Sequence, residues 1–223
     1  MSKKIYPFKE NIHSSAQDVI QLLKQSQSPL LLGIWGMSGI GKSTILHAIY
    51  DKIGPYFERK CFLSNVRRLW KQSTGRISLQ EQLLCYIART TEKMIPTVES
   101  RDILKKRLRH KRVLLLVDNV DNLEQLKDFC GNRDWFGPGS KIIITTSNRH
   151  LLKEHRVDHI YRVKELDESE SLKLFNWSAF GQATSHEGFA ELSRQIVAGD
   201  CLLLWKNLAG ICVKRNYLSG MVF

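Results

Sequence analysis

The sequence has few cysteines and no long apolar run, and each shortage excludes a class of protein. Its 223 residues include five cysteines, an odd number, and none of them forms a C-x-x-C pair. This pattern favours neither a disulfide framework nor a zinc site, and it predicts a reducing compartment, the cytoplasm or alternatively the nucleus. No run of about twenty apolar residues occurs, so we expect no membrane span. The N-terminus lacks the apolar core of a signal peptide.

Acidic residues are also scarce relative to basic ones. The chain has 34 Lys and Arg against 22 Asp and Glu, which gives a formal net charge of +12. Such a charge permits binding to nucleic acid. The basic residues are spread along the chain, however, and no motif with interleaved aromatic residues accompanies them. We therefore do not expect nucleic acid as the main partner, and a P-loop ATPase acting on nucleic acid is kept as an alternative.

What the sequence does contain is a phosphate-binding pattern, G-x-x-x-x-G-K-[ST]. It consists of Gly36, Met37, Ser38, Gly39, Ile40, Gly41, Lys42 and Ser43, with Thr44 next. An apolar run over 30–35 predicts a buried parallel strand before it, and 43–50 predicts an amphipathic helix after it. The glycines would let backbone amides wrap the phosphates of a nucleotide, and the helix N-terminus would face the same anion. The alternative is a glycine-rich turn that carries a lysine by chance.

A second apolar run ends in a carboxylate. Residues 113–117 predict a buried strand, and Asp118 follows at its carboxyl end. In P-loop proteins an aspartate in this place holds Mg²⁺, and we expect Ser43 to supply a second oxygen to the same ion. Lys42 would neutralise the β- and γ-phosphates. The alternative role for Asp118 is to cap the next helix.

Strands and helices alternate along most of the chain. We expect further strands over 61–66, 141–146 and 157–163, and helices near 19–23 and over 78–88, 102–109 and 122–129, with another opening at 167. This alternation predicts an α/β protein with a parallel sheet covered on both faces. Together with the phosphate-binding pattern, the alternation predicts a three-layer P-loop NTPase fold.

Six blocks of sequence together resemble one known family. They are GIWGMSGIGKST (33–44), CFLSNVR (61–67), LQEQLL (79–84), LLLVDNVD (114–121), GPGSKIIITT (137–146) and KELDESESLKLF (164–175). Their order and spacing resemble the NB-ARC nucleotide-binding module of plant disease-resistance (NLR) receptors, from about residue 30 to 198. Asp121 stands at the end of the 114–121 block, where a tryptophan marks the coiled-coil class of these receptors. In this respect the chain resembles the class that carries an N-terminal Toll/interleukin-receptor domain.

The resemblance implies a switch in plant defence signalling rather than a high-turnover enzyme. Such modules hold ADP at rest, exchange it for ATP with Mg²⁺, and then rearrange and oligomerise. The implied partners are an adenine nucleotide and a full-length receptor or another immune-receptor protein. The resemblance implies four divisions. They are an N-terminal segment (1–28), the nucleotide-binding domain (29–164), the start of an incomplete helical subdomain (165–198) and an aberrant tail (199–223).

Two positions depart from the family pattern at the nucleotide site. The family has two adjacent acids after the second strand, whereas this chain has Asp118 and then Asn119. An amide cannot accept the proton of an attacking water. The family also has an arginine after the Thr-Thr pair, where this chain has Ser147. We therefore expect nucleotide binding with impaired hydrolysis and assign no catalytic residue. A truncated fragment that acts as a non-switching decoy is a further alternative.

The tail departs most from the family pattern. The family continues with Gly-Leu-Pro-Leu-Ala-Leu-Glu, whereas this chain reads GDCLLLWKNLA over 199–209. One permitted set of codons for it is GGN GAY TGC CTN TTG CTT TGG AAR AAY TTG GCN. Shifted by two bases, that DNA can encode Gly-Leu-Pro-Leu-Ala-Leu-Glu-Glu-Leu-Gly. Our hypothesis is that the chain is out of frame from about residue 199, which would make it a truncated product.

The nucleotide sequence of the gene tests this hypothesis. We expect the second reading frame to encode the missing motif without interruption. Codons at Cys201 to Trp205 that cannot encode Pro-Leu-Ala-Leu in that frame would eliminate the hypothesis.

Overall fold

The computed structural model describes residues 7–88, 100–182, 184 and 188–198. These residues fall into two compact units. The sheet unit comprises residues 14–37 and 41–163, and the helical unit comprises 7–13, 38–40 and the residues from 164 onward. The tail over 199–223, where we expect the frame to be lost, lies outside the described residues.

The sheet unit contains five parallel strands in the order β2-β3-β4-β1-β5. The strands are β1 (Leu30–Trp35), β2 (Arg59–Leu63), β3 (Val113–Val120), β4 (Lys141–Thr146) and β5 (His159–Arg162). β4 therefore lies between β1, which leads into the phosphate loop, and β3, which carries Asp118. The sheet places the two predicted phosphate-site segments one strand apart.

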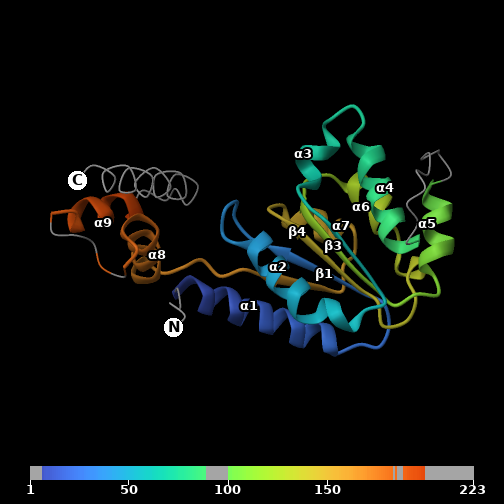
Figure 1. The fold of residues 1–223 in the computed structure, drawn as a ribbon, viewed down its shortest axis with the longest axis horizontal. Helices are drawn as coiled ribbons and strands as arrows, with labels where there is room; N and C mark the ends of the chain where they lie inside the picture. The colour runs from blue at the N-terminus through green and yellow to red at the C-terminus, as the bar shows by residue number, and fades with distance from the viewer. Residues whose placement is uncertain (1–6, 89–99, 183, 185–187, 199–223) are drawn as a thin grey trace, which may run out of the picture. The chain divides into compact units, whose positions relative to one another are not determined.

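Helices join the strands and cover the sheet. In chain order they are α1 (Pro7–Lys24), α2 (Lys42–Ile53), α3 (Val66–Trp70), α4 (Gly75–Ala88), α5 (Ser100–Leu108), α6 (Leu123–Phe129), α7 (Arg149–Glu154), α8 (Glu168–Phe180) and α9 (Ala190–Ala198), with 3-10 turns over Gly54–Tyr56 and Arg133–Trp135. In Figure 1 the strands run between α2 on one side and α4 and α6 on the other. The predicted three-layer α/β fold is confirmed.

The two faces of the sheet explain why its strands are apolar throughout. Along β3, Val113, Leu115 and Val117 join the cluster that packs with α4, α5 and α6, whereas Leu114 and Leu116 are also buried but lie outside it. Successive side chains of a strand point to opposite faces, so the second set faces the other layer, where α2 contacts β3 and β4. A strand covered on both faces needs a continuous apolar run, which is why these strands were legible in the sequence.

Some element boundaries differ from the sequence-based expectation. The first helix has 18 residues and begins at Pro7, well before the apolar residues that indicated it. The strand expected over 61–66 ends at Leu63, because Asn65 takes a left-handed conformation (φ 52°) and opens α3 at Val66. The short helices α3 and α7 were not predicted. None of the helices in the described parts of the chain is long and apolar enough to cross a membrane.

Within the helical unit, α8 begins with a capping box. The Asp167 side chain accepts a hydrogen bond from the backbone N–H of Glu170, and the Glu170 side chain accepts one from the N–H of Asp167. Asn11 Nδ2 also donates to Glu170 Oε1 at 3.0 Å. The reciprocal cap fixes where the helix starts, because it satisfies two amides that have no partner within the helix.

Candidate functional site

The loop between β1 and α2 turns sharply at its glycines. Gly39 has φ 85° and Gly41 has φ 102°, a region that residues with a Cβ rarely adopt. Gly41 is the N-cap of α2, and it provides no side-chain cap. The amides of Lys42, Ser43 and Thr44 therefore begin a helix without a capping acceptor and with no acidic residue in the first turn. Donors at a helix N-terminus form a favourable place for a phosphate.

Lys42 bends back onto the loop that precedes it. Its Nζ donates to the carbonyl oxygens of Gly36 (2.8 Å) and Met37 (2.6 Å), and the residue is buried. Burial lowers the pKa of Lys42, and the charge of Asp118 partly opposes this shift. An ammonium has three N–H donors. The two carbonyls account for two of them and hold the group in place, which leaves the third for another acceptor.

Asp118 joins three secondary-structure elements. Its carboxylate accepts a hydrogen bond from Ser43 Oγ, at 2.9 Å to Oδ1 and 3.0 Å to Oδ2, and another from Thr145 Oγ1, at 2.6 Å to Oδ1. These side chains come from β3, α2 and β4 respectively. The Asp118 side chain is nearly inaccessible to solvent. The carboxylate is thus held against the start of α2 by hydroxyl donors.

A bulge in β3 produces this geometry. Val117 pairs with Ile144 and Val120 pairs with Thr146, so two residues of β3 oppose one residue of β4. The two are Asp118 and Asn119, and Asn119 takes a left-handed conformation with φ 61°. Its backbone N–H donates to Thr145 Oγ1 at 2.7 Å. Bulges of this kind often redirect a side chain beside an active site.

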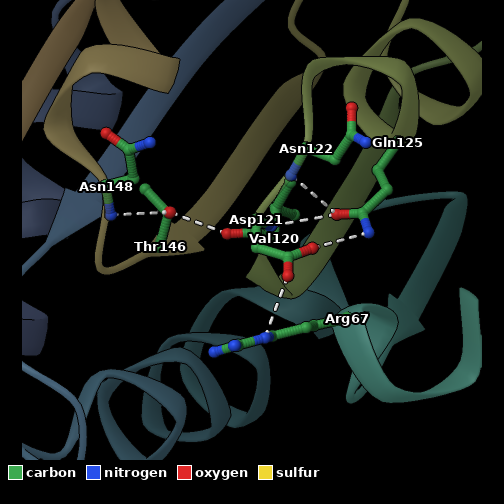
Figure 2. A network of polar contacts seen from close by, with 7 residues as sticks. All are labelled: Arg67, Val120, Asp121, Asn122, Gln125, Thr146 and Asn148. Carbon is green, nitrogen blue, oxygen red and sulfur yellow. Dashed lines mark hydrogen bonds and ion pairs between the residues drawn. The ribbon is translucent and has the colours of Figure 1, made fainter. Parts of the chain in front are cut away.

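A polar network fixes the chain just beyond the bulge (Figure 2). Arg67 Nε pairs with Asp121 Oδ2 at 2.9 Å, and Gln125 Nε2 donates to Asp121 Oδ1 at the same distance. The backbone N–H of Asp121 donates back to Gln125 Oε1. Thr146 Oγ1 donates to the Val120 carbonyl and accepts from the Asn148 N–H. The ends of β3 and β4 are therefore tied to each other and to α3 and α6.

The predicted site residues are placed as follows. Gly36, Met37, Gly41, Lys42, Ser43 and Thr44 lie in the sheet unit together with Asp118, and Lys42, Ser43 and Asp118 converge. Ser38, Gly39 and Ile40 group with the helical unit. Ser147 presents its carbonyl to Trp35 Nε1 at 3.2 Å. Arg149 lies over the Trp35 ring, 5.6 Å from its centroid.

Thr145 is a site residue that the sequence reasoning did not single out. It both donates to Asp118 and accepts from Asn119, and it is fully buried. The signal was a hydroxyl residue at the carboxyl end of the strand between β1 and β3, but the order of the strands was needed to see it.

The oxygen donors of the site suit a magnesium ion. Ser43 Oγ and the Asp118 carboxylate are within hydrogen-bond distance of each other, so both could reach one cation. Mg²⁺ is usually held by one or two protein oxygens, with phosphates and water completing the octahedron. Within the described residues no three His, Cys, Asp or Glu side chains gather as a metal cluster, which a shared protein–phosphate site does not require.

The family model described as the NB-ARC domain matches residues 12–185, and the chain belongs to this family. It is 33% identical over 205 residues to disease resistance protein RPP4 of Arabidopsis thaliana, covering 88% of this chain and 18% of that protein. It is 37% identical over 174 residues to TMV resistance protein N of Nicotiana glutinosa, covering 75% and 15%. The chain thus spans less than a fifth of the length of these relatives. The resemblance noted in the sequence is confirmed.

Solved structures confirm the fold at low sequence identity. Cdc6p from Pyrobaculum aerophilum matches with a TM-score of 0.60 and 14% identity, covering 88% of this chain and 56% of that one. Domain III of the replication initiation protein DnaA from Thermotoga maritima matches with a TM-score of 0.54 and 12% identity, covering 94% and 85%. These likenesses concern the arrangement of strands and helices only.

The role of Thr145 in holding the bulge is testable. Thr145→Val keeps the shape of the side chain, but it leaves the Asn119 N–H without its acceptor and removes one of the two hydroxyl donors to Asp118 Oδ1. We expect a loss of about 1–3 kcal/mol in the free energy of unfolding, measured by urea denaturation. Thr184→Val, at an exposed position outside any helix, should change it by less than about 0.5 kcal/mol. Equal effects of the two substitutions would contradict this role.

Proposed function

We propose that this NB-ARC module binds ADP and ATP with Mg²⁺ and acts as the switch element of a plant disease-resistance protein. The observation that carries the proposal is the convergence of Lys42, Ser43 and Asp118 beside the uncapped start of α2. Its membership of the NB-ARC family, with relatives named as disease resistance proteins, supports the defence role. The free cysteines Cys61, Cys85 and Cys130 support a reducing compartment such as the cytoplasm or the nucleus.

Each residue of the loop has a distinct task in this proposal. The backbone from Gly36 to Thr44 supplies amides to the phosphates, and Lys42 supplies a full positive charge to the β- and γ-phosphates. Ser43 and Asp118 hold Mg²⁺, which neutralises charge between the phosphates when it is bound. The hydrogen bond from Thr145 keeps Asp118 aimed at that position.

The proposed switch would respond to which nucleotide the chain holds. In this proposal residues 29–164 form the nucleotide-binding domain and 165–198 form the start of the helical subdomain. The change of contact unit between Val163 and Lys164 supports that division. An added γ-phosphate with its Mg²⁺ can bias a protein with two packings toward one of them, because it makes new contacts in only one. A full-length receptor or another immune receptor is the partner that would read this state.

In this proposal ATP hydrolysis is impaired. Asn119 stands where the family has an acid, and Ser147 stands where it has an arginine. Asn119 keeps its position through the bulge, so an acid at the same place would be presented in the same way. The nucleotide would therefore be retained rather than turned over.

The contribution of Lys42 to nucleotide binding can be measured by titrating the full chain with labelled ADP and ATP, with and without Mg²⁺. Lys42→Ala removes a charged contact to phosphate, so we expect affinity to fall by about 2–3 kcal/mol, which is roughly 30–150-fold. Lys71→Ala, an exposed lysine outside the loop, is the matched control and should bind as the unchanged chain does. Unaltered affinity in Lys42→Ala would refute the proposed site.

Hydrolysis should be recoverable by restoring the family residues. In the double variant Asn119→Asp, Ser147→Arg we expect the ATP turnover rate to rise at least about tenfold, because a base and a charged phosphate contact each contribute about a hundredfold or more to such reactions. The ADP dissociation constant should change little. Adding Lys42→Ala to the double variant should abolish the gain. Equal turnover in the unchanged chain and the double variant would show that these positions do not limit hydrolysis.

The two alternative functions, an ATPase acting on nucleic acid and a decoy fragment, would give different results in these assays. An ATPase acting on nucleic acid would show turnover stimulated by DNA or RNA, which the net charge of +12 alone would favour. A decoy fragment would fail to bind either nucleotide while still associating with a full-length receptor. Asn119 in place of an acid argues against the ATPase, and the convergence of Lys42, Ser43 and Asp118 argues against a fragment that binds no nucleotide.

A further inference from the structure

A cavity lies at the opposite end of the sheet from the phosphate loop. It has a volume of about 270 Å³, and its lining includes Lys141, the first residue of β4, and Arg112, the residue before β3. The phosphate loop follows the carboxyl end of β1, beside Thr145. With a rise of about 3.3 Å per strand residue, roughly 15 Å of β4 separates the two places. All the lining residues belong to the sheet unit.

One part of the cavity wall is apolar and aromatic. Ile20 and Leu23 of α1 contribute buried aliphatic surface, and Ile53 contributes from the end of α2. Tyr56 and Phe57 follow α2, and the Tyr56 side chain is 73% exposed. A large exposed aromatic side chain beside a cavity offers surface that an apolar ligand could cover. This wall is suited to a flat or compact apolar body.

The rest of the wall is cationic. Lys24, Arg112 and Lys141 all line the cavity, and of its described lining residues none is Asp or Glu. Lys141 is only 6% exposed, and its Nζ donates to the Ser26 carbonyl at 2.6 Å. Burial lowers the pKa of Lys141, and the nearby charge of Arg112 lowers it further, while Asp158 opposes the shift. Two cations therefore face each other here at an electrostatic cost.

The carboxylate that acts on Lys141, Asp158, is already engaged by other donors. Asp158 Oδ1 already pairs with Arg133 Nη2 at 2.5 Å, and its Oδ2 accepts the backbone N–H of Leu31 at 2.8 Å. The carboxyl ends of α1 and α2 also point toward the cavity, and each contributes a partial charge of about −0.5. Against three full positive charges, these helix ends leave the cavity with a net positive charge.

The arginine is held in place by its neighbours. The Arg112 guanidinium carbon lies 5.0 Å from the centroid of the Phe57 ring. Gly139 also lies beside Arg112; it has φ 74°, and its backbone N–H donates to the Gln27 carbonyl. A Cβ on Gly139 would lie 3.2 Å from Arg112 Nε, so the glycine leaves room for the guanidinium. A guanidinium held against an aromatic ring is prepared to bind a planar carboxylate.

We propose that this cavity is a binding site for a small amphipathic anion, with an aromatic body against Tyr56 and Phe57 and a carboxylate facing Arg112 and Lys141. The cavity volume is close to the lower end of ligand pockets, roughly 300 Å³, which limits the ligand to about two fused rings. The carboxylate relieves the repulsion between the two cations, and the ring covers exposed aromatic surface. The site is separate from the nucleotide site in both position and chemistry.

Naphthalene-2-carboxylate is a suitable probe, and naphthalene-2-carboxamide is its neutral match. Each is titrated into the full chain by calorimetry and by methyl NMR. We expect saturable binding of the carboxylate, at least tenfold weaker binding of the amide, and chemical-shift changes at Ile20, Leu23 and Ile53. Equal affinity for acid and amide, no saturable carboxylate binding at millimolar concentration, or shift changes confined to other methyl groups would each overturn the proposal.

Variants test the charges directly. Arg112→Gln and Lys141→Met should each weaken carboxylate binding at least tenfold while leaving the amide unchanged. Arg68→Gln and Lys71→Met, exposed cations of the α3 region outside the cavity, are matched controls and should bind like the unchanged chain. Circular dichroism and ADP titration of each variant show that the fold and the nucleotide site are intact. Undiminished carboxylate binding in both cavity variants would contradict the assignment.

Discussion

The hydrogen bonds that Asp118 accepts from Ser43 and Thr145 hold the phosphate end of this protein together. They connect the first turn of α2, the bulge of β3 and the end of β4 through one buried carboxylate. A buried charge is costly unless its hydrogen bonds are made, so each of the three elements depends on the others keeping their positions. Lys42 is held separately, by the carbonyls of Gly36 and Met37.

In the proposed function the same arrangement separates nucleotide binding from hydrolysis. The groups suited to phosphate and Mg²⁺ are backbone amides, Lys42, Ser43 and Asp118, and hydrogen bonds hold these side chains in place. Asn119 and Ser147, to which the proposal assigns the loss of hydrolysis, contact Thr145 and Trp35 through their backbone. The proposal therefore assigns binding and hydrolysis to different residues.

The sequence was sufficient for the features that depend on local pattern. The loop and its strand and helix are contiguous, and the buried strands are apolar on both faces, so both could be predicted without knowing the strand order. Thr145 could not, because its role exists only once β4 is placed between β1 and β3. The bulge was hidden as well, since nothing in Asp118-Asn119 distinguishes a bulge from regular strand until the register with β4 is known. The cavity lined by Arg112 and Lys141 could not be predicted, because its walls come from four segments that are distant in the sequence. The start of α7 could have been predicted, because Asn is a common N-cap residue. The Asn148 side chain accepts a hydrogen bond from the backbone N–H of His150.

The left-handed conformation of Asn119 also bears on how such a module can change over generations. Asn and Asp are the side chains that tolerate this backbone best, and their codons differ by a single base. The bulge therefore suits an amide or an acid at residue 119, and one point mutation exchanges the two. In the proposed function, such a mutation would change the lifetime of the bound nucleotide and leave the scaffold as it is.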